Sequence, residues 1–447
     1  MKRDKRGNPA AKTILFFALI LFSESAFPQT ETLPRQWDLQ ACIDYALANN
    51  IQVKTAEVNK NIAEVETKQT RAAFFPTVSA SVGQNFGNYP FASSAAGTSS
   101  ASGTGNYGIN ASWQIFDGGV RSANVKQADI NDEIARLSIE ESKNNIKLAI
   151  IQNYLQILYA GEAVKTFENA LQLSAAQLES NRVKLSVGAV AKSDVSQWES
   201  QHASDNYQLT NARITLDNYK LKLKQLLELD ALQTMDIAPD TPSDEEVLAL
   251  LPDRNDIFST AVKIMPQVKS GRLNTEYSQL SISKAKAGYL PKISLQAASA
   301  TGNVYNNTNY SFGTQLKNNW NNTIGISVNI PIYSNREVKS AVEKARMSVE
   351  TSKLNEISIY KELLANIETA YLNALNSQAQ YLAAEEKVRS SRESYDVMDE
   401  QFRLGLKNTI ELLTEKNTLI SAQQELLQAK YTALMNRKIL DYYQGII

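Results

Sequence analysis

The sequence predicts a mainly α chain with membrane β-strands, four strands per chain, built from two internal repeats. Three observations lead to this fold class: a long self-similarity, strand-length segments of alternating polarity, and long tracts of helix-forming residues. Residues 46–79 align with residues 261–294 at an offset of 215, and positions further along align at an offset of 217. Because a unit of this length must hold several elements, it implies two equivalent halves rather than a short-period solenoid.

Each half contains two segments in which apolar residues alternate with small polar ones, as in a strand with two different faces. Each segment is roughly ten residues long, the length of a tilted transmembrane strand. Half-buried strands of soluble proteins alternate in the same way, so the alternation alone leaves both alternatives open. Within these segments the alternation is regular over Val78–Gly83, Ile109–Ile115, Ile293–Ala297 and Ile324–Ile330.

Two further features favour membrane strands. The face opposite the apolar residues is small and neutral, mainly Ser, Asn, Gln and Gly, as expected beside a water-filled lumen. Aromatic residues also gather at the strand ends, as in the aromatic girdles of membrane barrels. The predicted membrane-interface aromatics are Phe74, Phe75, Phe116, Tyr289 and Tyr333 at one end, and Trp320, Phe86, Tyr89 and Tyr107 towards the other.

The two strands of each half are separated by a stretch rich in Gly, Ser, Ala, Asn and Tyr, at 88–105 and 302–319. This composition is typical of exposed loops. A linker between domains is the alternative, although strands flank each stretch closely on both sides. We therefore expect both stretches to be outer loops.

Two tracts, 119–183 and 336–403, are almost free of Gly and Pro, and each predicts one very long helix. At ~1.5 Å per residue such a helix would be about 100 Å long. Shorter tracts accompany them, so in each half two short helices are expected to stack end to end and pack antiparallel along the long one, with coiled-coil-like contacts. These tracts cover 51–75 and 190–229 in the first half, and 260–287 and 406–442 in the second.

The predicted domain organisation follows from these elements. Residues 1–28 form a signal peptide, with a basic start and an apolar stretch from Ile14 to Phe22 that is too short to cross a bilayer. An uncleaved anchor is the alternative. The first repeat covers 36–229, an inter-repeat segment covers 230–255, and the second repeat covers 256–445.

Composition excludes several classes of function. The net charge is −1, so the chain has no basic field for nucleic acid. One Cys and one His exclude an internal disulfide and a Cys/His zinc cluster. No nucleophile–base arrangement or phosphate-binding loop stands out, so we expect no enzyme activity, no cofactor and no metal.

The number of strands predicts the assembly. Four strands cannot close a barrel, and open edges in lipid would leave backbone groups unpaired. Two chains would give eight strands, whose interior fills with side chains. A homotrimer with a 12-strand β-barrel is the smallest assembly expected to leave a pore.

Several segments carry a more specific signal: LQACIDYALANN (39–50), RAAFFPTVS (71–79) with its echo at 287–294, FRLGLKNTIELL (402–413) and AQQELLQAKYTAL (422–434). None of them is decisive alone, but their order and repetition are specific. Through these segments the sequence resembles the TolC-type outer membrane efflux proteins over essentially the whole mature chain.

The resemblance implies that the barrel lies in the outer membrane, among its lipids, and continues into a 12-helix tunnel in the periplasm. It implies a passive duct for small molecules or proteins, as in efflux and type I secretion. Its partners would be a periplasmic membrane-fusion adaptor and an inner membrane transporter of the RND, ABC or MFS type. Residues 230–255 would form an equatorial collar or a plain linker. A non-conducting periplasmic coiled-coil scaffold is the alternative function.

The resemblance also suggests a docking site at two helix-hairpin tips. A glycine in each tip has a simpler explanation, since many helices end on a left-handed Gly. Both explanations agree with the pattern. The predicted adaptor-docking residues are Val187, Gly188, Ala189, Leu404, Gly405 and Leu406.

A periplasmic gate is implied just beyond the tips. Asp194 and Glu411 would form carboxylate rings that narrow the tunnel, and Lys407 would pair with Asp194 across neighbouring hairpins. The alternative is that both acids only favour the helix dipole, with Ser193 or Thr409 as helix caps.

Overall fold

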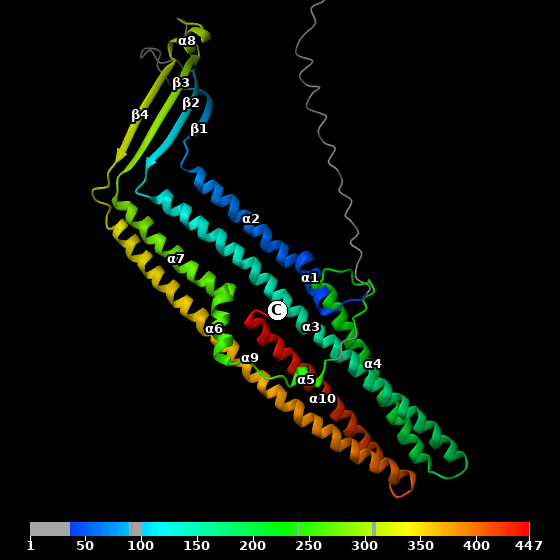
Figure 1. Ribbon diagram of the computed structural model, residues 1–447. Helices are drawn as coiled ribbons and strands as arrows, with labels where there is room; N and C mark the ends of the chain where they lie inside the picture. The colour runs from blue at the N-terminus through cyan, green and yellow to red at the C-terminus, as the bar shows by residue number, and fades with distance from the viewer. Residues whose placement is uncertain (1–35, 89–90, 92–100, 239–241, 306–309, 447) are drawn as a thin grey trace, which may run out of the picture.

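The computed structural model describes residues 36–88, 91, 101–238, 242–305 and 310–446. The predicted signal peptide at 1–28 and the interface residue Tyr89 lie outside these ranges. The described chain is long and narrow, with a sheet at one end, helices along its length and two hairpin turns at the other end (Figure 1).

The sheet has four strands in the order β1-β2-β3-β4, and every neighbouring pair is antiparallel. The predicted strands are confirmed, although β1, β2 and β3 are longer than ten residues, with 12, 16 and 14 residues. The bounds are β1 Thr77–Asn88, β2 Ala101–Phe116, β3 Lys292–Tyr305 and β4 Asn321–Asn329.

The expectation that 88–105 and 302–319 are wholly loops is wrong. The pairing of β2 with β3 continues to Gly103 opposite Tyr305, so both strands extend into the predicted loops. A short helix, α8 (Phe312–Asn318), follows, and its first turn is capped by the Ser311 hydroxyl, which accepts from the Thr314 amide. Because both stretches have the composition of loops, the sequence did not indicate the strand extensions or helix α8.

The two faces of the sheet differ in polarity, as the alternation predicted. On the apolar face the side chains of the edge strands have little cover within the chain: Val82 of β1 is 80% exposed and Ile324 of β4 is 77% exposed. Exposure of so many apolar side chains is unfavourable in water, so another apolar phase or surface must cover this face.

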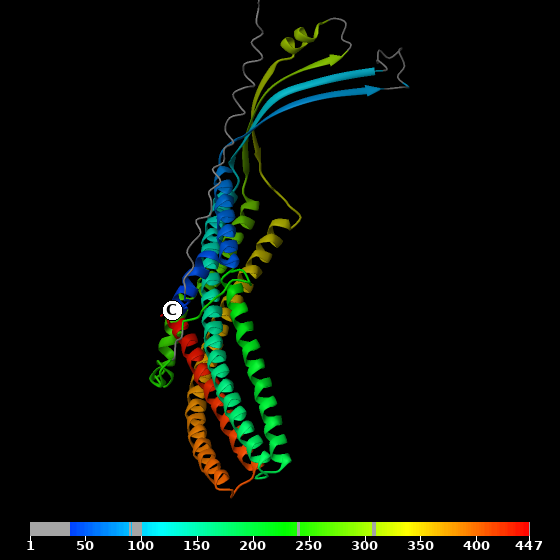
Figure 2. The same cartoon turned by 90° about the vertical axis from the view of Figure 1, so that its right-hand side faces the viewer.

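The long helices α3 (Val120–Ser186) and α9 (Glu337–Arg403) have 67 residues each. Helices α2 (Ile51–Ala72) and α4 (Lys192–Leu226) lie along α3, while α7 (Pro266–Lys286) and α10 (Thr409–Gln444) lie along α9 (Figures 1 and 2). The predicted end-to-end stacking is present, because the Asn50 side chain, just before α2, donates to the Leu226 carbonyl at 2.9 Å.

Each repeat begins with an extra helix that the sequence analysis did not separate. Helix α1 (Leu39–Asn49) precedes α2, and α6 (Arg254–Ile264) precedes α7. The break in the first repeat is at Asn50, whose side chain caps α2. The break in the second is at Met265, and α7 begins at Pro266, because proline lacks an N–H and favours the first position of a helix.

The two repeats agree in backbone conformation. Gly118 and Gly119 have φ of 74° and 90° just before α3, and Asn335 and Arg336 have φ of 46° and 66° just before α9. Both pairs lie in the left-handed region and are related by the offset of 217. The equivalence therefore holds even where the first repeat uses glycine and the second does not.

The inter-repeat segment crosses the helices about midway along the chain (Figure 1). It contains the short helix α5 (Asp244–Val247), where Asp244 accepts a hydrogen bond of 2.6 Å from the Tyr381 hydroxyl of α9. Arg437 of α10 donates to the carbonyls of Ala249 and Leu250. These contacts attach the segment to both helices of the second hairpin.

In the part of the chain that the structure describes, no helix has the length and apolar character needed to cross a membrane.

Candidate functional site at the hairpin tips

The two tips have the same backbone geometry. Gly188 and Gly405 both have φ of 75°. In the first tip the Gly188 amide donates to the Leu185 carbonyl and the Ala189 amide donates to the Lys184 carbonyl. This is a Schellman motif, which ends a helix on a left-handed residue and satisfies its last carbonyls.

The second tip repeats this motif, and both tips present apolar side chains to solvent. Val187 is 76% exposed, Leu404 is 66% exposed and Leu406 is 71% exposed. The tips lie at the end of the molecule opposite the sheet (Figure 2). The structure therefore brings the six predicted tip residues to one end of the molecule, with three apolar side chains free for contact.

The acids beyond the tips each close the first turn of the returning helix. The Asn408 side chain accepts from the Glu411 amide at 3.0 Å, and Glu411 accepts from the Asn408 amide at 3.1 Å. This reciprocal pair is a capping box. In the first hairpin Asp194 accepts from the amide of Ala191, the equivalent of Asn408, at 3.2 Å. The expected caps Ser193 and Thr409 are therefore wrong, since both lie inside their helices.

Within the chain Lys407 does not pair with Asp194 as expected. Its ammonium group donates to Glu411 at 2.7 Å. Asp194 instead accepts from the Thr409 hydroxyl at 3.0 Å. Lys407 lies in the turn just before α10, four residues before Glu411, so it reaches that carboxylate across the first turn of the helix. A Lys407–Asp194 pair between copies stays a prediction.

The pKa of Glu411 is lowered from its ordinary value, first by the hydrogen bond from Lys407 and then by the Asn408 amide. Replacing Lys407 with alanine removes the larger cause, so the pKa should rise towards its ordinary value. In planar bilayers we expect a higher leak current at neutral pH. As the pH falls, Glu411 of the variant should take up its proton at a higher pH than in the wild type.

Lys222→Ala, which removes an exposed lysine elsewhere on the helical part, is the control and should leave the leak unchanged. A closed state of Lys407→Ala with wild-type leak and pH dependence would contradict a gating role for this pair.

A buried ion pair connects the two hairpins and was missed by the sequence analysis. The Lys416 ammonium donates to Asp205 at 2.6 Å and to the Ala170 carbonyl at 3.3 Å. The two side chains are only 3% and 7% exposed. Burial is the largest influence on Lys416 and lowers its pKa, against the opposing effect of Asp205. Lys416 lies between Leu412 and Leu419 in an apolar stripe, and this position was the available signal.

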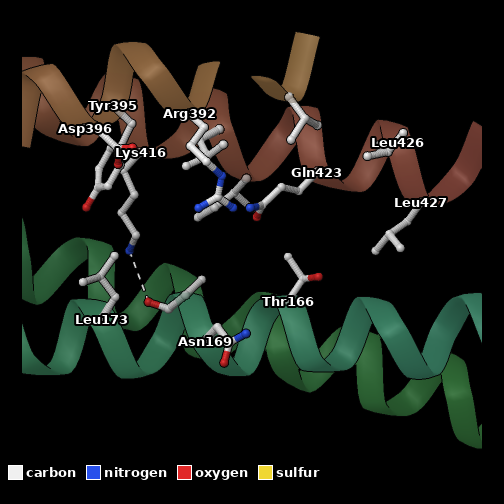
Figure 3. A pocket seen from close by; sticks show the side chains of 14 residues that line it. Thr166, Asn169, Leu173, Arg392, Tyr395, Asp396, Lys416, Gln423, Leu426 and Leu427 are labelled. Atoms are coloured by element: carbon white, nitrogen blue, oxygen red, sulfur yellow. Dashed lines mark hydrogen bonds between the residues drawn. The ribbon is translucent and has the colours of Figure 1, made fainter. Parts of the chain in front are cut away.

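Lys416 also borders a groove of about 510 Å³ between the hairpins, lined by residues of α3, α9 and α10. Figure 3 shows its side chain reaching from α10 towards α3. Arg392 of α9 and Gln423 of α10 line the same groove. Next to the ion pair, Gln201 and Asn417 exchange amide hydrogen bonds of 3.1 and 3.2 Å. The hairpins are thus joined by a polar seam inside an otherwise apolar contact.

Of the predicted interface aromatics that the structure describes, all but Tyr107 are exposed. The Tyr107 side chain is half-buried, and its hydroxyl group bonds to Gln84 at 3.1 Å and to Asn303 at 3.2 Å. Phe75 and Tyr333 are 73% and 85% exposed near the junction of sheet and helices, and Trp320 is 63% exposed at the far end. Phe74, Phe116 and Tyr289 are exposed at the junction as well. Their contact with lipid stays a prediction.

The family model described as outer membrane efflux protein matches residues 42–228 and 258–444. The chain belongs to the outer membrane efflux protein family. The two matches fall on the two repeats and leave the inter-repeat segment between them.

Individual relatives agree with this membership. The outer membrane protein TolC of Escherichia coli K12 is 23% identical, over 94% of this chain and 84% of that protein. The proteases secretion protein PrtF of Dickeya chrysanthemi is 21% identical, over 97% of this chain and 92% of that protein. The solved structure of CusC has a TM-score of 0.78 at 15% identity, covering 92% of this chain and 93% of that one, which shows the shared fold.

The protein is therefore an outer membrane channel of the TolC-like efflux and secretion type. The mainly helical fold with its membrane-type strands agrees with that membership. Its relatives are channel and secretion proteins rather than enzymes. The alternative of a non-conducting periplasmic scaffold finds no support in these similarities.

Proposed function

We propose that three copies of the chain form the outer membrane duct of a tripartite efflux or type I secretion system. The observation that carries this proposal is the four-stranded sheet, which has an exposed apolar face and, among the described strands, one unpaired edge on β1 and one on β4. Such a sheet is stable in lipid only when its edges are paired. Three copies supply a closed barrel wide enough for a lumen.

The helical part extends from the sheet by the length of α3 and α9 and would form the periplasmic tunnel. Transport through this tunnel would be passive, because the proposed mechanism assigns no energy-consuming step to this chain. The tips would dock a periplasmic adaptor, which connects the duct to an inner membrane transporter. Asp194, Glu411 and Lys407 would line the closed periplasmic end, and the interface aromatics would mark the membrane boundaries.

Purification and conductance measurements test the proposal directly. We expect a protein that requires detergent, migrates as a trimer on gels unless it is heated, and conducts ions in planar bilayers. A monomer that stays soluble without detergent and does not conduct would overturn the proposal. The same preparation serves for the variants described below.

A further inference from the structure

Lys292 is the only residue with a charged side chain among the described residues of the four strands. It begins β3, at the end of the sheet that joins the helices (Figure 1). A charged side chain in a membrane strand is costly where it faces lipid, whereas one that faces a lumen tunes which solutes pass. The face of the sheet on which Lys292 lies therefore decides what this residue can do.

The strand register places Lys292 on the polar face. Lys292 lies opposite Asn329 of β4. The next residue, Ile293, lies opposite Val328 on the apolar face. Because successive side chains of a strand point to opposite faces, Lys292 lies on the face that needs no apolar cover. In the barrel proposed above the apolar face contacts lipid, so the Lys292 side chain points into the lumen.

The ammonium group of Lys292 has no partner within the described part of its own chain. Its side chain is exposed and takes part in no hydrogen bond or ion pair with another described residue. Asp117, which follows β2 at the same end of the sheet, is already bound by Arg121 at 3.1 Å, and the two side chains are only 15% and 12% exposed. This carboxylate is therefore engaged elsewhere and leaves the charge of Lys292 free.

The repeat shows that the fold does not require a lysine at this position. The offset of 215 relates Lys292 to Thr77, which begins β1 in the same way. Thr77 lies opposite Ser112, the equivalent of Asn329, and its hydroxyl group donates to the Ser112 carbonyl at 3.2 Å. A small neutral residue thus fills the equivalent backbone position in the first repeat. Lys292 adds a charge that the architecture itself does not need.

We propose that Lys292 of three copies forms a ring of ammonium groups where the tunnel opens into the barrel, and that this neck ring attracts anions. The duct then favours solutes that carry carboxylate or phosphate groups at this point of their path. Rings of lysine or arginine side chains give pores a preference for anions and phosphates. The inference rests on the proposed trimer, because a single chain supplies only one of the charges.

The dimensions of the proposed barrel let the neck ring act across the whole lumen. Twelve strands at a spacing of ~4.8 Å and a tilt of about 40° enclose a barrel ~24 Å across between opposite backbones. The flexible lysine stems reach inwards from this wall. The axis then lies within about one Debye length of each charge, ~8 Å at physiological salt. Screened Coulomb attraction concentrates a monovalent anion roughly fivefold at the axis, and a multivalent anion more strongly.

Block of the ion current by a polyanion tests the neck ring. Inositol hexakisphosphate added on the barrel side of a planar bilayer reaches Lys292 without passing the periplasmic end. We expect it to block the wild-type channel, and Lys292→Gln to raise the half-blocking concentration at least about tenfold. Lys292→Arg keeps the charge and should keep the block. Raising the salt from about 0.1 M to about 1 M should weaken the wild-type block, because the Debye length falls from about 10 Å to about 3 Å.

The first repeat supplies a variant that adds charge, and the apolar face supplies a control. Thr77→Lys places three more lysines at the equivalent position and should lower the half-blocking concentration. Lys317→Gln removes the same charge from α8. This helix lies on the apolar face, because Thr301, an even number of residues after Ile293, donates from its hydroxyl group to the Leu316 carbonyl of α8 at 2.6 Å. Lys317→Gln should therefore leave the block unchanged.

The outcomes separate the neck ring from the proposed function. If trimers conduct but the wild type is not blocked, or Lys292→Gln is blocked as strongly as the wild type, the neck ring is wrong while the proposed duct stands. An equal loss of block in Lys317→Gln would place the bound polyanion outside the lumen and overturn the ring as well. If the wild-type chain forms no trimer or does not conduct, the proposed function itself fails.

Discussion

Replacing Lys416 with methionine is expected to destabilise the helical part by about 3–5 kcal/mol, because it leaves the buried Asp205 carboxylate without its partner. The carboxylate would keep only its hydrogen bond from Gln201 at 2.7 Å. Thermal unfolding in detergent, followed by the helical circular dichroism signal, measures the change. The loss should be largest in the half of the helical part that carries the tips, where the pair joins the hairpins.

Two further variants give this experiment its controls. The double replacement of Lys416 by methionine and Asp205 by leucine removes both charges together, and its stability should lie close to that of the wild type. Lys387→Met breaks an ion pair of similar length, 2.7 Å to Glu425, whose side chains are about half exposed. That change should cost at most about 1 kcal/mol. Equal effects of Lys416→Met and Lys387→Met would contradict the buried-pair argument.

The second large effect is expected at the hairpin tips. Leu404→Asp together with Leu406→Asp should abolish export while trimers still assemble. Both side chains are exposed within the chain, so their loss removes little internal packing. Charged side chains at this position would instead have to be buried without partners when the adaptor docks. Export by cells that carry each variant, together with trimer content on unheated gels, measures both parts of the prediction.

Matched changes separate docking from folding. Leu232→Asp alters a leucine that is 93% exposed in the inter-repeat segment, away from the tips, and should leave export unchanged. Bulky or charged replacements at Gly188 and Gly405 should also abolish export. Gly405→Asn keeps a residue that tolerates the left-handed conformation and isolates the effect of side-chain size. Normal export by the double leucine variant, with trimers present, would exclude docking at the second tip.

Much of the fold could be predicted because it follows from periodic patterns. The strands, the two long helices and the tip glycines are each specified by local sequence, and the repeat provides a second copy of every signal. Shorter features escaped. Helix α8 lies in a stretch with loop-like composition, and the break at Met265 depends on a single proline that begins α7.

The site was predicted less completely, for a physical reason. Lys416 and Asp205 belong to different repeats and are brought together only by the packing of α10 against α4. No local pattern can specify such a pair. Lys407 was expected to pair with Asp194 across neighbouring hairpins; within the chain it donates to Glu411, a carboxylate only four residues further along the sequence.

The buried ion pair has no counterpart between copies. The repeat offset of 217 converts Asp205 into Ala422 and Lys416 into Glu199, so the equivalent positions between copies hold an alanine and a glutamate, which cannot form an ion pair with each other. In the proposed trimer, parting the two hairpins of one copy would therefore break a buried ion pair, whereas parting hairpins of neighbouring copies would break none at the equivalent positions. The periplasmic entrance would then widen as three paired blades that separate along three lines, rather than as six hairpins that move independently.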